Sequence, residues 1–254
     1  MKNRDLFDFL CTLAPLELQL GFDNAGFLVG DIEAGVSRVL LSLDVTEEVI
    51  DEAVRIGAEL IISHHPFIWT PLKSVTGDGL TSRKLMKLIK NDISVISLHT
   101  NLDIAEGGVN DVLISLLGAV RTDTLDSDGC GRIGELQEEL CLEEFLVHCR
   151  SVLNVKGLRY VDGGRRVKRL AVMGGAGADA MYDAIEKGCD TYVTADVKYH
   201  QFLEAKELGL NLIDADHFCT ENPVMPVLAE KLRAAFPALD VHLSAVHSQV
   251  VSFI

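Results

Sequence analysis

The apolar run over residues 58–62 restricts the fold of this chain most, because it stops abruptly at Ser63-His64-His65-Pro66. A short apolar run rich in β-branched residues is typical of a buried parallel strand. Such a strand delivers two imidazoles to its carboxyl end, which is where open α/β sheets hold their ligands. Adjacent residues on a strand point to opposite faces, so two functional histidines require a backbone turn, which Pro66 favours.

Helical and strand patterns alternate along the rest of the chain, which predicts an α/β fold. Helices are expected near residues 3–14, between a Thr46 N-cap and Gly57, and over residues 82–90. A further helix should begin close to Pro223. The other expected strands cover residues 36–43, 93–98, 170–173, 210–213, 239–243 and 250–254.

The chain also resembles itself. Residues 53–63 align with residues 184–194, and in each copy a strand precedes a helix that ends near a glycine and leads into a β-branched strand. This pattern predicts two similar α/β modules related by internal duplication, with right-handed crossovers. We expect a first module over 1–125 and a second over 126–254, whose C-terminal segment is a candidate to return to the first. His64-His65 corresponds to Ala195-Asp196 in the second copy.

Two glycine-rich stretches resemble nucleotide-binding loops. Residues 129–134 spell G-x-G-x-x-G, but a dinucleotide fingerprint follows a strand and opens a helix, whereas polar loop residues precede this one. We therefore interpret it as a turn. Gly174-Gly175-Ala176-Gly177 does follow a strand and precede a helix, a position that suits a phosphate, but it lacks the Lys and Ser/Thr spacing of a Walker motif.

Charge and cysteine content narrow the partners. The 254 residues carry 23 basic against 38 acidic side chains, a formal charge of −15, which argues against duplex nucleic acid and anionic membrane surfaces. Six cysteines without a C-x-x-C pair indicate reduced thiols. No stretch has the character of a signal peptide or a membrane span. We expect a cytoplasmic protein.

Three predicted strand ends supply a set of side chains that suits metal ions. Imidazoles combined with carboxylates favour Zn, Fe, Mn or Co over Ca, and a carboxylate is able to bridge two ions. Two ions together activate a bridging water. The candidates are His64, His65, His99, Asp103, His217 and Glu221.

Several of these assignments leave alternatives open. His99 suits a ligand, an acid/base beside the metals or a partner of Asp103. Asp23-Asn24 favours a local Asx turn. Cys219 lies between two candidate ligands, and we expect it to be buried instead. No role is assigned to His148, His242 or His247.

The motifs that surround these residues resemble the Nif-three-like dinuclear-metal proteins, often described as type 2 GTP cyclohydrolase I. The resemblance runs nearly the full length in order. It rests on Gly21-Phe22-Asp23-Asn24-Ala25-Gly26, Ser63-His64-His65-Pro66, His99-Thr100-Asn101-Leu102-Asp103, Gly107-Gly108-Val109-Asn110-Asp111, Gly131-Arg132-Ile133-Gly134, Thr194-Ala195-Asp196-Val197-Lys198-Tyr199-His200 and Asp216-His217-Phe218-Cys219-Thr220-Glu221. The chain departs from the family at Ala195 and Asp216, where glycine is commoner.

The resemblance implies two intertwined α/β/α modules with two divalent metal ions in the cleft between them, and a toroidal homohexamer. It implies His64, His65, Asp103, His217 and Glu221 as ligands, with Glu221 as a candidate bridge. The implied activity is a metal-dependent hydrolase on a nucleotide that converts GTP to dihydroneopterin triphosphate and formate. His99 or His200 is available for proton transfer, and Lys198 or Arg132 for the triphosphate. The alternative is a non-catalytic metal-binding regulatory or scaffold protein.

Overall fold

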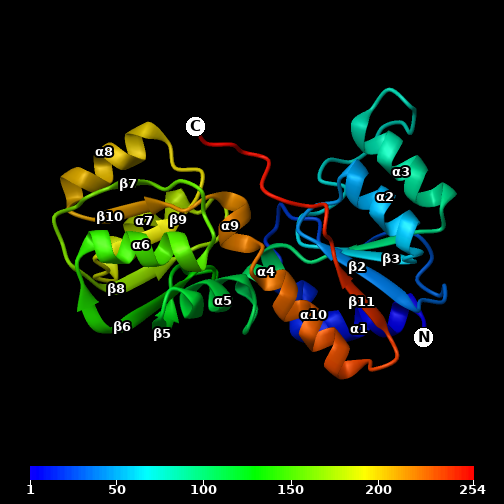
Figure 1. Ribbon diagram of the computed structural model, residues 1–254, viewed down its shortest axis with the longest axis horizontal. Helices are drawn as coiled ribbons and strands as arrows, with labels where there is room; N and C mark the ends of the chain where they lie inside the picture. Colours follow the sequence, from blue (N-terminus) through cyan, green and yellow to red (C-terminus); the bar gives the residue numbers. More distant parts are fainter. The chain divides into compact units, whose positions relative to one another are not determined.

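A computed structural model describes residues 1–254, and the chain divides into two compact units (Figure 1). The first unit consists of Met1–Ala105 and Met225–Ser248, and the second of Glu106–Val224 and Gln249–Ile254. The chain therefore leaves each unit and later re-enters it, so both are built from discontinuous segments.

The first unit contains a five-stranded sheet in the order β1-β4-β3-β2-β11. Strands β4, β3, β2 and β11 are parallel to one another, and the edge strand β1 pairs antiparallel with β4. Every residue of β3 and β4 is buried, as expected of inner parallel strands that are covered on both faces. The strands are β1 (Gly26–Val29), β2 (Arg38–Ser42), β3 (Leu60–Ser63), β4 (Ser94–Ser97) and β11 (Asp240–Leu243).

Helices cover both faces of this sheet. α2 and α3 lie on one face, and α1 and α10 on the other (Figure 1). α2 begins where the side chain of Thr46 accepts a hydrogen bond from Val49 N at 3.2 Å, and it ends at Gly57, whose φ is 70°. Both predicted ends of this helix are confirmed. The helices are α1 (Asn3–Leu13), α2 (Glu47–Ile56), α3 (Leu80–Lys90), α4 (Thr100–Ile104) and α10 (Val224–Ala235), with a short η1 (Leu16–Leu18).

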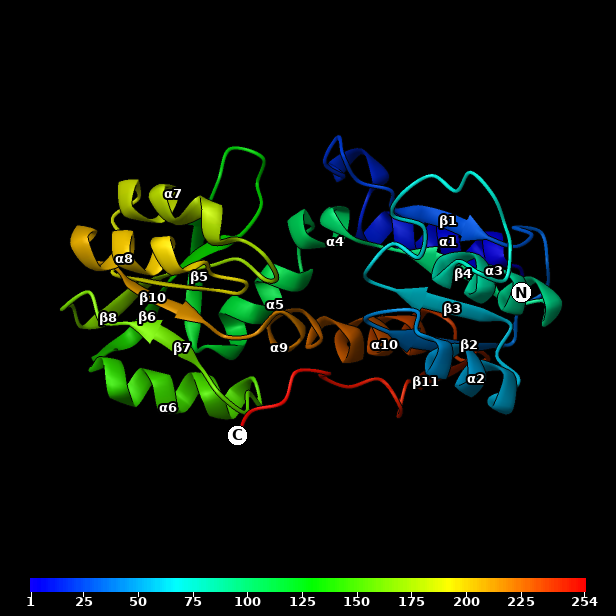
Figure 2. The ribbon, with the colours of Figure 1, turned by 90° about the horizontal axis from the view of Figure 1, so that it is seen from above.

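The second unit contains a six-stranded sheet in the order β5-β6-β8-β9-β10-β7. Alternate residues of its inner strands face opposite helix layers: Val193 and Ile213 pack with α5 and α6, whereas Tyr192 and Leu212 pack with α7 and α8. Figure 2 shows α6 on one side of this sheet and α7 and α8 on the other. The strands are β5 (Ala119–Thr124), β6 (Arg132–Leu140), β7 (Arg159–Val161), β8 (Val167–Val172), β9 (Thr191–Thr194) and β10 (Asn211–Asp214). The helices are α5 (Val109–Leu116), α6 (Leu142–Val152), α7 (Met181–Glu186), α8 (Tyr199–Leu208) and α9 (His217–Glu221), with a short η2 (Ala178–Ala180).

The two sheets share a topology. In the first, four consecutive strands lie in the order β1-β4-β3-β2, and in the second, four consecutive strands lie in the order β7-β10-β9-β8. In both sets the edge strand is antiparallel to a parallel trio. The α/β class with two similar modules is thus confirmed, and this shared order is what an internal duplication requires.

Two expectations about elements are corrected. Residues 250–254 form no strand: the apolar run has β propensity, but its side chains are exposed and it pairs with no sheet edge. Residues 129–134 are only in part a turn, because residues 129–131 lie in a loop and residues 132–134 begin β6. This loop follows a further strand, β5, which ends at Thr124. No helix opens at this motif, in agreement with its rejection as a dinucleotide fingerprint. None of the helices combines the length and apolar character needed to cross a bilayer.

The segment after β11 is fastened to α2 by one buried carboxylate. Glu52 accepts hydrogen bonds from Ser244 Oγ at 2.6 Å and from Ala245 N at 3.2 Å. We expect Glu52→Gln to lower the free energy of unfolding by about 1–3 kcal/mol, because an NH2 group replaces one of the two carboxylate oxygens, each of which accepts one of these bonds. Hydrogen exchange at residues 244–247 should accelerate. Glu48→Gln, on the exposed side of the same helix, is the control; equal effects of the two changes would contradict this anchoring.

Candidate functional site

The carboxyl ends of neighbouring parallel strands in the first unit carry the predicted histidines. β3 leads into His64 and His65, and β4 leads into His99. Their ring centroids are 5.0 Å (His64–His65), 5.2 Å (His64–His99) and 5.8 Å (His65–His99) apart. One ring nitrogen of each lies within 4.8 Å of the others, an arrangement that could hold a metal ion.

Each of these imidazoles is held at Nδ1 by an oxygen. His64 Nδ1 lies 2.8 Å from Leu98 O, and His65 Nδ1 lies 2.7 Å from Asp44 Oδ1. His99 Nδ1 lies 2.8 Å from Asp23 Oδ1. A carbonyl or carboxylate oxygen only accepts, so the proton sits on Nδ1 and the lone pair on Nε2. This is the tautomer that binds a metal through Nε2, with the oxygen acceptor orienting the ring.

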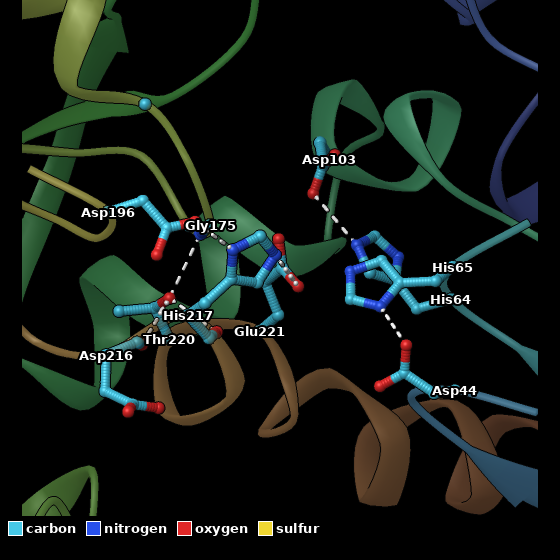
Figure 3. A network of polar contacts seen from close by, with 12 residues as sticks. Asp44, His64, His65, Asp103, Gly175, Asp196, Asp216, His217, Thr220 and Glu221 are labelled. Carbon is cyan, nitrogen blue, oxygen red and sulfur yellow. Dashed lines mark hydrogen bonds and ion pairs between the residues drawn. The ribbon is translucent and has the colours of Figure 1, made fainter. Parts of the chain in front are cut away.

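Asp103 joins this group from the short helix α4. Its Oδ1 lies 3.7 Å from Nε2 of His64, and both residues are buried (Figure 3). Metal–ligand bonds of about 2.0–2.2 Å place neighbouring donors of one ion roughly 3 Å apart. Small shifts of the two side chains would bring them to that separation, so the pair fits a shared ion.

The second unit places its candidate ligands at the corresponding edge of its own sheet. His217 and Glu221 lie one turn apart on α9, which follows β10, and His217 Nε2 is 3.1 Å from Glu221 Oε2. Asp196, after β9, holds His217 Nδ1 at 2.8 Å (Figure 3). The spacing of four residues places both side chains on one face of the helix, and the imidazole is oriented by a carboxylate as in the first unit.

Two glycines make room for Glu221. A Cβ on Gly175 would overlap Glu221 Oε1 and lie 3.1 Å from His217 Nε2, and a Cβ on Gly174 would lie 3.3 Å from Glu221 Cγ. Gly175 also has a φ of 64° and donates from its N–H to Thr220 Oγ1 at 3.0 Å. The glycine-rich stretch that suggested a phosphate loop thus lies against the two candidate ligands.

The structure explains why this chain tolerates Asp216 where glycine is commoner in the family that it resembles. Its φ is 72°, a conformation that favours glycine, which is the commoner residue there. Its side chain caps α9 by accepting from Cys219 N at 3.0 Å, and it also accepts from Gln249 Nε2. These bonds offset backbone strain that typically costs about 1–3 kcal/mol.

Other residues singled out in the sequence have different surroundings. Lys198 and His200 are exposed at the start of α8. Arg132 is buried, and its guanidinium bonds Asp111 Oδ1 at 2.7 Å and the carbonyls of Gly129 and Gly131. Cys219 is buried as expected, and burial raises the pKa of its thiol to about 12.

Sequence reasoning missed the residues that hold the imidazoles. Asp44 and Asp196 each follow a parallel strand, so the strand-end rule that selected the histidines would also have found them. Asp23 has a fully buried side chain and binds His99 and Thr100, which a local Asx turn does not predict. Burial disfavours its ionisation, but the bonds from His99 and Thr100 outweigh this and lower the pKa of Asp23 to about 2.

His247 also belongs to this network. Its Nε2 lies 3.0 Å from Asp44 Oδ2, so the Asp44 carboxylate is shared by His247 and His65. Burial opposes the charge of Asp44, yet hydrogen bonds from His247 and His65 hold its pKa well below the ordinary value. No sequence pattern marks His247, because it follows the last strand in an irregular segment.

Gly175→Ala tests the space behind Glu221. We expect purified protein to lose most of its bound divalent metal, measured by elemental analysis, because the added Cβ displaces the Glu221 carboxylate. Gly164→Ala is the control: Gly164 has a φ of 80° but nothing within 4 Å of the added Cβ. Both variants should lose about 1 kcal/mol of stability from backbone strain. If Gly175→Ala retains as much metal as Gly164→Ala, Glu221 is not a metal ligand.

His247→Ala tests the contact with Asp44. We expect metal affinity to fall about tenfold in competition with a chromogenic chelator, because Asp44 then orients His65 less well. His242→Ala removes a partly exposed imidazole that bonds Asp240 and should leave the affinity unchanged. Equal affinities for the two variants would show that His247 does not act through Asp44.

Comparisons with known proteins agree with this fold. The Duf34/NIF3 (NGG1p interacting factor 3) family matches residues 1–251. A Clostridium perfringens protein named GTP cyclohydrolase 1 type 2 homolog is 41% identical over 240 residues, covering 92% of each chain. A protein of the same name from Clostridium acetobutylicum is 34% identical and covers 98% of this chain and 96% of its own. The crystal structure of a Staphylococcus aureus hypothetical protein aligns with a TM-score of 0.92 at 30% identity, over 100% of this chain and 99% of that one. The chain therefore belongs to the Duf34/NIF3 family.

Proposed function

We propose that this protein is a dinuclear-metal-dependent hydrolase that acts on a nucleotide, with GTP opening to dihydroneopterin triphosphate and formate as the leading reaction. The observation that carries the proposal is the state of four imidazoles. In each of them Nδ1 is hydrogen-bonded to an oxygen acceptor, which leaves the lone pair of Nε2 to bind a metal ion or a proton. The four residues are His64, His65, His99 and His217. The name of the relatives supports the choice of a nucleotide.

The proposed ligands combine imidazole nitrogens with carboxylate oxygens, a chemistry that suits Zn, Fe, Mn or Co. They are His64, His65, Asp103, His217 and Glu221, with Glu221 as the candidate bridge. When bound, two such ions supply Lewis acidity that lowers the pKa of water and offsets developing negative charge.

His99 is the proposed acid/base. Asp23 fixes its tautomer and orientation, and Asp23 stays ionised at neutral pH because its pKa is about 2. A neutral imidazole held in this way accepts a proton at Nε2 and later returns it. His200 is the second candidate for this role, and exposed Lys198 is the candidate contact for the triphosphate. We do not include Arg132, since Asp111 and two carbonyls occupy its guanidinium.

The proposal extends to assembly and location. Tyr199 and Leu203 lie one turn apart on α8 with their side chains exposed, which gives apolar surface for contacts between copies in a homohexamer. All six cysteines are free, which is typical of a reducing compartment such as the cytoplasm.

The first test combines metal content with turnover. Protein purified without chelator should contain about two divalent ions per chain and release formate from GTP. His65→Ala combined with Glu221→Ala should lose both properties. His99→Gln should keep its metal but release formate about 10²–10⁴-fold more slowly. His148→Gln, outside both donor sets, is the control.

Two outcomes would count against the proposal. Full metal occupancy without formate or phosphate release from any nucleotide would remove the hydrolase assignment and favour a metal-binding regulatory or scaffold protein. Absence of metal from the wild type, or unchanged metal in the double variant, would remove the ligand set itself.

A further inference from the structure

Two exposed aromatic rings stand beside the histidines of the first unit. Trp69 is 53% exposed and Phe22 is 67% exposed, and their ring centroids are 6.1 Å apart with planes inclined by 55°. The Trp69 ring centroid is 5.4 Å from that of His99, at an interplanar angle of 88°. Neither neighbour is stacked face to face on the indole, so π-surface of Trp69 stays open next to the candidate acid/base.

The backbone on either side of these rings is fixed. Asp23 follows Phe22 and binds His99 and Thr100, and Asn24 Nδ2 donates to the carbonyl of Ile68 at 2.6 Å. Ile68 immediately precedes Trp69. The loop of Phe22 and the loop of Trp69 are therefore tied to each other and to His99. Large exposed rings held in place in this way lose little conformational entropy when a ligand binds.

We propose that Trp69 and Phe22 form a stacking surface for the planar heteroaromatic ring of the substrate, with a purine base as the ligand class. This rests on the proposed function, since it names what would hold the base while His99 acts beside it. Base–aromatic stacking needs no cation. It therefore suits a protein with a formal charge of −15 better than recognition through phosphate does.

Trp69 is the only tryptophan of the chain, so its fluorescence reports directly on this surface. Guanosine, which has the base but no phosphate, should quench the emission of the protein as purified, and ribose 5-phosphate should not. Phe22→Leu should weaken guanosine binding several-fold in the same titration, and Phe22→Tyr should restore it. Trp69→Leu should lower the affinity about tenfold by calorimetry, with a smaller loss for Trp69→Phe. Tyr160→Leu, an exposed aromatic of the second unit, is the control.

Three results would overturn the stacking surface. They are the absence of guanosine quenching, equal quenching by ribose 5-phosphate, and affinities unchanged in both leucine variants. If the leucine variants reduce the molecular mass in solution without changing guanosine affinity, the two rings form a contact between copies of the chain instead. The hydrolase proposal fails separately: quenching without formate release leaves the surface intact, and formate release without quenching removes only the surface.

Discussion

The parallel pairing of β2, β3 and β4 is the constraint on which the first half of the candidate site depends. Ser42 is in register with Ser63, and Ser63 with Ser97, so the three strands end at the same level. Ser63 Oγ lies 2.8 Å from Ser97 Oγ and donates to His65 O at 2.9 Å, which ties the strand ends to the turn that follows. A slip in this register would separate the histidines and detach His65 from Asp44.

The second unit uses the same scaffold with different side chains. The strand pair that carries Asp44 and His65 in the first sheet corresponds to the strands that lead into Gly175 and Asp196 in the second. There the strand ends supply space and a hydrogen-bond acceptor, and the ligand-type residues move to α9. Gly175 has no side chain where Glu221 needs room. A duplicated framework would thus permit the copies to specialise, because the strand ends set positions while the residues after them set chemistry.

Local patterns in the sequence predicted the elements that carry the site. They could not predict contacts between residues that are far apart in the sequence. α2 begins after Thr46 and ends at Gly57, as predicted, and the apolar runs before His64 and His99 are β3 and β4. β6 was missed because its exposed half is rich in glutamate. The bond from His99 to Asp23 joins residues 76 positions apart, and the bond from His247 to Asp44 spans 203 positions. Periodicity reports one element at a time, so it carries no information about such pairs.

The charges around His64, His65 and His99 determine whether metal ions or the nucleotide would bind first under the proposed function. The ionised groups that hold these rings are carboxylates: Asp23 and Asp44 have lowered pKa values, so both remain negative at neutral pH. Asp103 adds a third acidic side chain beside His64. An anionic triphosphate is repelled by this edge until cations offset the carboxylates, whereas the uncharged base is not. Metal binding before nucleotide binding, with the base rather than the phosphates held on the first unit, is the sequence of events that these charges favour.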